Sequence, residues 1–324
     1  MRNKRVLITG GLGFIGSNLA HCCVAHGAEV TIYDSLDLRA AGNLYNVHDI
    51  RTDLRLISKD IRDFGEVSKA VRNQDVIFNC AAFSSHTMSM KEPLIDIDVN
   101  CKGLLYLLEA TRQFNINAKF VQIGTSTQIG RMLYSPIDEH HPEFPIDIYS
   151  ANKAASEKYT LIYTSAFGMR TTVIRLANVF GPRSRISTPD FGFVNYFVGL
   201  ALQGKDLTVF GDGAQLRNIS YVEDCVNALM SAAESERANG EVFFATSDRQ
   251  YSVAEIAQSI STHIGGSIRF IPWPADRRAI EVGDAVISNA KIKGLLGWKP
   301  QYSLSEGMIL TRDYFRPCLN DYLT

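Results

Sequence analysis

Runs of hydrophobic residues alternate with longer amphipathic stretches over the first half of the chain. Each run holds four to six residues and is rich in Val and Ile, which favours strands buried on both faces. The stretches between them repeat their apolar positions with a helical period. This alternation predicts an α/β fold, a doubly wound parallel sheet covered by helices on both faces. The predicted strands are 5–9, 29–33, 54–58, 76–79, 119–123 and 171–176, and the predicted helices are 14–26, 64–72, 93–114 and 150–167.

The pattern loosens after residue 177, where glycine and proline mark more of the loops. We expect a smaller, mixed α/β lobe there, over residues 178–324, which binds the substrate. Residues 1–177 would form the first domain, and residues 221–240 would return to it. The predicted elements of the smaller lobe are helices at 192–203, 222–234, 253–263 and 289–296 and short strands near 207, 242 and 268.

Gly10, Gly13 and Gly16 are three of the four glycines that follow the first predicted strand and lead into the first predicted helix. The first suits a tight turn, the second a close approach of backbone to phosphate, and the third close packing of helix on strand. Free N–H groups at the start of the helix would then bind an anion. A carboxylate ends the next strand, where it could bind the ribose hydroxyls of NAD and repel the 2′-phosphate of NADP. This Rossmann-type unit predicts cofactor contacts at Gly10, Gly13, Phe14, Ile15, Gly16 and Asp34.

A phenol and an amine lie four residues apart at Tyr149 and Lys153. On a helix this spacing brings both side chains to one face, and the ammonium is expected to lower the pKa of the phenol. A hydroxyl of the turn at Thr125 could hold a substrate oxygen opposite Tyr149. Without the nucleotide site, a merely polar helix and turn would be the better interpretation. With it, the set predicts hydride transfer coupled to proton transfer at a C–OH group.

Residues 83–89 follow the fourth predicted strand directly, so we expect them to border the substrate. Ser84 and His86 are the candidate contacts in this segment. The alternative for His86 is an exposed loop histidine without a function.

The bulk properties exclude several classes of protein. A net charge of −1 gives no reason to expect a nucleic acid or an acidic membrane as partner, and no apolar run is long enough to span a bilayer. The six cysteines are scattered, and the seven histidines show no metal-ligand spacing. No leader precedes the first strand, so we expect a soluble, cytoplasmic protein without a metal.

Several further motifs follow these in order, among them Arg175-Leu-Ala-Asn178-Val-Phe-Gly-Pro-Arg183 and Tyr221-Val-Glu-Asp224. Together with the glycine turn and the Tyr149/Lys153 pair, they resemble the extended short-chain dehydrogenases/reductases. Within that group the chain is similar to the NAD-dependent epimerase/dehydratase family, typified by UDP-galactose 4-epimerase. The resemblance runs nearly from end to end of the chain.

The resemblance implies a role for single positions. Tyr149 matches the catalytic base and Thr125 its Ser/Thr partner. Positions that contact NAD in the family are matched by Asp60, Ile61, Ala81, Ala82, Asn100 and Lys153. Positions that bind the diphosphate of a nucleotide sugar, most often a UDP-sugar, are matched by Asn178, Arg217 and either Arg277 or Arg278. Of the last two, we take Arg278 as the candidate contact. The family often dimerises through helices around residues 100 and 155, so a homodimer is expected.

The departures from the family pattern narrow the reaction. Dehydratases carry a carboxylate base directly after the catalytic Thr, and decarboxylases carry one at the next place, but Ser126 and Thr127 stand there in this chain. The resemblance therefore favours epimerisation of a nucleotide sugar at C4 through a 4-keto intermediate. A 4-ketoreductase, a C2-epimerase or a decarboxylase stay open as alternatives. A catalytically silent, NAD-sensing protein is disfavoured by the complete Tyr149/Lys153/Thr125 set.

Overall fold

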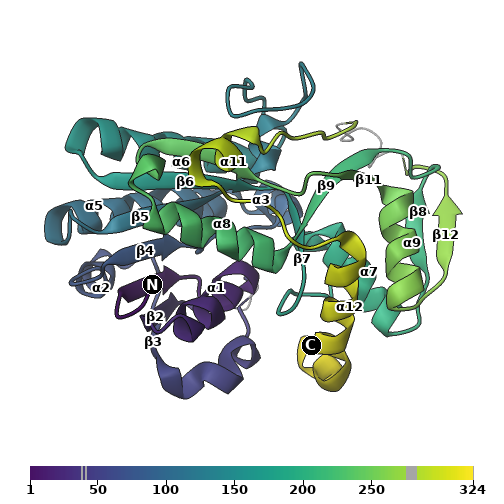
Figure 1. Ribbon diagram of the computed structural model, residues 1–324, viewed down its shortest axis with the longest axis horizontal. Coiled ribbons are helices and arrows are strands. Elements are labelled where there is room, and N and C mark those ends of the chain that lie inside the picture. The colour runs from purple at the N-terminus through teal and green to yellow at the C-terminus, as the bar shows by residue number, and fades with distance from the viewer. Residues whose placement is uncertain (38, 41, 275–282, 324) are drawn as a thin grey trace.

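The computed structural model describes residues 1–37, 39–40, 42–274 and 283–323. Its largest element is a seven-stranded parallel sheet of order β10-β6-β5-β4-β1-β2-β3 (Figure 1). The order reverses at β1, which pairs with β2 on one side and β4 on the other. The strands are β1 (Arg5–Thr9), β2 (Glu29–Asp34), β3 (Leu54–Ser58), β4 (Val76–Asn79), β5 (Lys119–Thr125), β6 (Arg170–Leu176) and β10 (Glu241–Ala245).

Helices cover both faces of this sheet because its strands are apolar on both. In β1, Val6 and Ile8 join the core under α1 (Phe14–Ala25), α8 (Val222–Glu234) and α11 (Ala290–Leu296). Leu7, between them, points into the opposite core. That second core lies under α2 (Phe64–Ala70), α5 (Leu104–Phe114) and α6 (Ile148–Phe167). The predicted doubly wound α/β class is confirmed.

A smaller lobe lies beside the carboxyl ends of the strands, on the right of Figure 1. It contains a three-stranded sheet, a two-stranded sheet and three helices around one apolar core. Its strands are β7 (Asn178–Phe180), β9 (Leu216–Tyr221) and β11 (Gln250–Ser252) in one sheet and β8 (Leu207–Phe210) and β12 (Ile268–Ile271) in the other. Its helices are α7 (Phe193–Leu202), α9 (Val253–His263) and α12 (Leu304–Phe315).

The structure differs from the sequence prediction in several segments. The single helix expected over 93–114 is α4 (Pro93–Ile97), a π-helical stretch (Asp98–Gly103) and α5. The expected strand near 242 is β10, which pairs with β6 in the main sheet and not in the smaller lobe. The short helix α3 (His86–Lys91) and the whole of α12 were not predicted. No helix among the described residues has both the length and the apolar character needed to cross a bilayer.

Candidate functional site

A cavity of about 350 Å³ opens at the carboxyl ends of the central strands, where the smaller lobe meets the sheet. This is the place at which doubly wound folds bind their ligands, and the volume suits a small molecule. The glycine turn after β1 and residues after β2, β4, β5 and β6 all contribute to its wall. The predicted site residues in the wall are Gly10, Gly13, Phe14, Ile15, Gly16, Asp34, Asp60, Ile61, Ala81, Ala82, Ser84, His86, Thr125, Tyr149, Lys153 and Asn178.

The glycine turn has no room for side chains. Gly10 has a φ of +64°, and a Cβ there would lie 2.6 Å from the backbone nitrogen of Ala81. A Cβ on Gly16 would lie 2.3 Å from the carbonyl oxygen of Gly10. Gly13 is the N-cap of α1 and offers no side chain to the first turn. The N–H groups of that turn therefore face the cavity without a side-chain cap, which fits a pyrophosphate.

The carboxylate of Asp34 lies at the end of β2 and lines the same cavity. One oxygen accepts a hydrogen bond from the backbone N–H of Leu12 at 3.0 Å, and the other from Leu36 at 2.9 Å. Each oxygen keeps a lone pair for a ribose hydroxyl. Nearby, Arg39 pairs with Asp37 at 2.7 Å. This pairing places a second carboxylate beside the cation that could otherwise attract a 2′-phosphate.

Two predicted cofactor residues have other partners as well. Asp60 lines the cavity, but its carboxylate also accepts two side-chain hydrogen bonds from Arg62, at 2.9 and 2.6 Å. Asn100 lies outside the lining residues. Its amide is buried and bonds to both the N–H and the carbonyl of Phe83. Asn100 thus holds the segment after β4 in place from behind the wall.

The phenol, the amine and the threonine converge as predicted. α6 begins one residue before Tyr149, with Asp147 as its N-cap. Tyr149 and Lys153 are both buried, and the Lys153 ammonium donates to the carbonyl oxygen of Ile123 at 2.5 Å. Thr125, the last residue of β5, lines the same cavity, and its hydroxyl acts to lower the pKa of the phenol. An acid–base pair and a hydroxyl therefore face one cavity.

The expected lowering of the phenol pKa by Lys153 is wrong for the protein without a ligand. Burial raises the pKa of Tyr149, the negative charges of Asp96 and Asp147 raise it further, and only the hydrogen bond with Thr125 opposes them. Burial also lowers the pKa of Lys153 to about 8. Desolvation thus outweighs the helical spacing, because both side chains are removed from water.

Only some of the residues predicted to bind the substrate line the cavity. Ser84, His86 and Asn178 line the cavity. Arg217 is on β9 and not among the lining residues, and its guanidinium donates to the carbonyl oxygens of Leu216 and Gly283. Arg277 and Arg278 lie outside the described residues.

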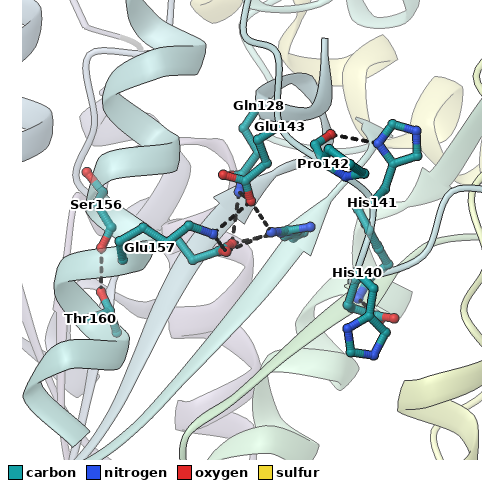
Figure 2. A network of polar contacts seen from close by, with 12 residues as sticks. Gln128, His140, His141, Pro142, Glu143, Ser156, Glu157 and Thr160 are labelled. Atoms are coloured by element: carbon teal, nitrogen blue, oxygen red, sulfur yellow. Dashed lines mark hydrogen bonds and ion pairs between the residues drawn. The ribbon is translucent and has the colours of Figure 1, made fainter. Parts of the chain in front are cut away.

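A buried ionic network, which the sequence did not predict, supports the turn after β5 from behind (Figure 2). The guanidinium of Arg175, on β6, donates twice to the carboxylate of Glu157, on α6, at 2.7 Å. Gln128, in the turn, donates to the same carboxylate at 2.9 Å and to Glu143 at 3.2 Å. Glu157 lies one helical turn after Lys153. The network therefore fixes α6 and the turn after β5 against one another.

Asp147 was also missed, although its sequence position carried a usable indication. An Asp directly before an amphipathic helix is a common N-cap. Its second oxygen contacts His86, which the sequence had placed in the cavity wall without a partner.

Among the described residues, no group of His, Cys, Asp or Glu side chains could hold a metal ion.

Comparisons with known proteins agree with this geometry. A family model described as GDP-mannose 4,6 dehydratase matches residues 7–311. UDP-N-acetyl-alpha-D-glucosaminuronate decarboxylase of Bacillus cytotoxicus is 31% identical over 98% of this chain and 99% of its own. CDP-paratose 2-epimerase of Salmonella typhi is 27% identical over 94% of this chain and 97% of its own.

Solved structures extend the likeness to the whole fold. UDP-glucose 4-epimerase of Thermotoga maritima, with UDP-glucose, has a TM-score of 0.87 at 29% identity and covers 97% of this chain and 99% of its own. The enzyme of the same name from Thermus thermophilus, in complex with NAD, has a TM-score of 0.85 at 30% identity over the same shares. The match over nearly the whole chain and the cofactor cradle lead to one conclusion. The protein belongs to the NAD-dependent epimerase/dehydratase family, and NAD is its cofactor.

Proposed function

We propose that the protein epimerises a nucleotide-diphosphate sugar, in the first place a UDP-sugar, at C4 through a 4-keto intermediate. The observation that carries the proposal is the convergence of Tyr149, Lys153 and Thr125 on one cavity beside the glycine turn. NAD, held by the glycine turn, Asp34 and Lys153, would supply the acceptor and then the donor of the C4 hydride. Tyr149 takes the proton of the C4 hydroxyl in the first half of the reaction and gives it back in the second.

The surroundings of Tyr149 support the other proposed roles. The neutral phenol is its stable form, since burial raises its pKa, and it suits the return of a proton to the ketone oxygen. Thr125 holds the same oxygen and stabilises the phenolate by its hydrogen bond. Lys153, held at Ile123, would bind the ribose of the cofactor as a cation.

The turn after β5 supports epimerisation over elimination. Ser126 and Thr127 carry hydroxyls, which are too weakly basic to remove a proton from carbon. The hydroxyl of Thr127 also lies 3.1 Å from that of Thr125 and accepts from Ser150 at 3.0 Å. These two contacts indicate that the hydroxyl of Thr127 helps to hold the turn in position. The turn thus lacks a carboxylate that a dehydratase would need there.

A decarboxylase, a C2-epimerase and a 4-ketoreductase are the alternatives; a 4-ketoreductase would perform only the second half of the proposed reaction, the reduction of a ketone. The first two are favoured by relatives that carry these names, a Bacillus cytotoxicus decarboxylase and a Salmonella typhi 2-epimerase. For each of these reactions, Ser84, His86 and Asn178, which line the wall, are the proposed contacts of the sugar nucleotide. Arg217 and Arg278 remain candidates for its diphosphate on the family resemblance alone.

A product assay tests the proposal. NAD-loaded protein is incubated with UDP-glucose, UDP-galactose, UDP-N-acetylglucosamine and UDP-glucuronate, and the products are separated by capillary electrophoresis. The expected result is the C4 epimer of at least one sugar at constant carbon number. Release of CO₂ from UDP-glucuronate without a C4 epimer would instead establish the decarboxylase, and no turnover with any of the four would contradict the proposal.

A further inference from the structure

A histidine–carboxylate pair lies beside the catalytic phenol. The Nδ1 atom of His86 is 2.8 Å from Oδ2 of Asp147, and the His86 ring packs edge-to-face on the Tyr149 ring at a centroid distance of 4.9 Å. Both His86 and Tyr149 line the cavity. The side chain of His86 keeps 44% of its surface exposed, so the ring is open to a ligand there.

Asp147 is held rigidly enough to orient the imidazole. Its Oδ1 atom accepts the backbone N–H of Ser150 at 2.8 Å as the N-cap of α6, which leaves Oδ2 for His86. Burial acts to raise the pKa of Asp147, but the pKa is lowered overall, with the hydrogen bonds from His86 and Ser150 among the causes, so the carboxylate is ionised. A carboxylate on Nδ1 fixes the tautomer that carries its proton there. The lone pair of Nε2 is then available as a base.

The sugar chemistry offers such a base a task. A ketone at C4 acidifies the C–H bonds of C3 and C5, and the hydroxyl side chains of the turn cannot remove those protons. Tyr149 is occupied at the oxygen of C4. An imidazole in contact with the phenol is therefore next to the carbons that flank the ketone.

We propose that His86, oriented by Asp147, is a second catalytic base, which removes and returns a proton at C3 or C5 of the 4-keto sugar. The C–H bond breaks, the proton goes to Nε2, and the electron pair forms a C=C bond to C4, whose oxygen becomes an enolate held by Tyr149 and Thr125. Return of the proton restores the ketone, so no oxidant or reductant is consumed. The proposal rests on the proposed function only for the origin of the ketone, and it adds an exchange, or inversion, next to C4.

Solvent deuterium separates this step from C4 epimerisation. The hydride that leaves C4 comes back to C4, so simple epimerisation in D₂O brings no deuterium onto carbon. Proton removal by His86 brings deuterium onto C3 or C5. The probe is a UDP-4-keto-6-deoxyhexose, added to NAD-loaded protein in D₂O and followed by NMR and mass spectrometry against a protein-free blank. Supplying the ketone directly makes the test independent of the first oxidation.

We expect wild-type protein to catalyse the exchange and His86→Phe, which keeps a ring against Tyr149, to lose about 10²-fold or more of its rate. Asp147→Ser keeps a good N-cap but removes the partner of Nδ1, and it should lose about tenfold or more. Asp63, the N-cap of α2, accepts the backbone N–H of Glu66 at 3.1 Å but is not among the cavity-lining residues, so Asp63→Ser is the matched control and should exchange at the wild-type rate.

The outcomes distinguish the two proposals. Exchange by wild-type protein, lost in His86→Phe, together with no C4 epimer from any UDP-sugar, overturns C4 epimerisation and leaves the His86 base standing. A C4 epimer without exchange of the ketone probe overturns the His86 base and leaves epimerisation standing. Exchange that survives in His86→Phe, or that is lost in Asp63→Ser as well, also overturns it.

Discussion

Single residues at the centre of the site have pKa values far from their ordinary ones. Lys153, on α6, and Lys119, on β5, are both buried, and burial lowers the pKa of each to about 8. Lys153 bonds near the carboxyl end of β5, at Ile123, whereas Lys119 begins the strand at its other end and bonds to Asn239. One buried lysine thus faces the cofactor site, and the other provides a control at the opposite edge.

Binding of NAD should weaken as the pH rises through about 8. The protonated ammonium of Lys153 is the donor for the ribose hydroxyls, and a hydrogen bond from a charged group is worth about 1.5–3 kcal/mol. Calorimetric titration of cofactor-free protein between pH 6.5 and pH 10 should show a fall in affinity of about tenfold or more. Lys153→Gln should abolish that fall and Lys119→Gln should retain it. An affinity of the wild type that does not change with pH would refute the role of Lys153.

Tyr149→Phe removes one hydroxyl and keeps the ring packed on His86. We expect kcat to drop by about 10² to 10⁴ with NAD binding unchanged, which is the usual contribution of a general acid–base group. Tyr163→Phe is the matched control, since Tyr163 is buried in the same helix but bonds to Glu109. Steady-state kinetics and an NAD titration of both variants provide the measurement. Normal turnover by Tyr149→Phe would rule out the mechanism.

Helices and strands were predictable where one periodic pattern covers the whole element. The strands β1 to β6 and helices α1, α2, α6, α8 and α9 follow from runs of apolar residues. α12 carried a usable indication that was missed, the capping box of Ser303 and Glu306. β7 and β11 hold three residues each, and the pairing of both with β9 depends on residues far apart in the sequence, which no local pattern contains.

The residues of the site were likewise predictable only where a local pattern of the sequence places them. Tyr149, Lys153 and Thr125 could be found because spacing along one helix and the end of one strand place them. The sequence could not show that Asn100 and Arg217 lie outside the cavity wall, because their contacts depend on how loops pack. The burial that sets the pKa of Tyr149 comes from several elements together, so it has no trace in the local sequence.

The turn between β1 and α1 should not tolerate a methyl group at its third glycine. In Gly16→Ala the new Cβ would meet the carbonyl oxygen of Gly10 at 2.3 Å, so the turn must move. We expect a loss of about 1–3 kcal/mol in the free energy of unfolding and at least tenfold weaker binding of NAD. Gly294→Ala is the control in α11, where a Cβ meets no atom within 4 Å, and it should be neutral or stabilise by up to about 1 kcal/mol. Urea unfolding and NAD titration compare the two; equal stability would contradict the steric argument.

At the scale of the whole molecule, apolar side chains are exposed on the helices around residues 100 and 155. Leu94 and Ile97 on α4 and Ile162 and Phe167 on α6 are all more than two-fifths exposed. The two helices pack against one another. Exposed apolar surface of this kind favours association, and we propose that it forms the interface of a homodimer.

A charge in this region should break the dimer. Light scattering after gel filtration should give twice the chain mass for wild-type protein and the single mass for Ile162→Glu. Phe270→Glu on β12 is the control, because Phe270 is 54% exposed, close to the 51% of Ile162, but belongs to the smaller lobe. A wild-type protein of single mass, or equal effects of both changes, would contradict the interface.

The chain passes between the large sheet and the smaller lobe several times. It leaves the sheet after β6, returns for α8 and β10, leaves again for β11, α9 and β12, and returns for α11 before ending beyond α12. Sugar specificity therefore cannot be transplanted from a relative as one cassette. A chimaera with a single crossover would divide at least one core between two parents, whereas exchange of the smaller lobe needs matched junctions at each passage. Gene libraries for altered specificity should be built with that many junctions.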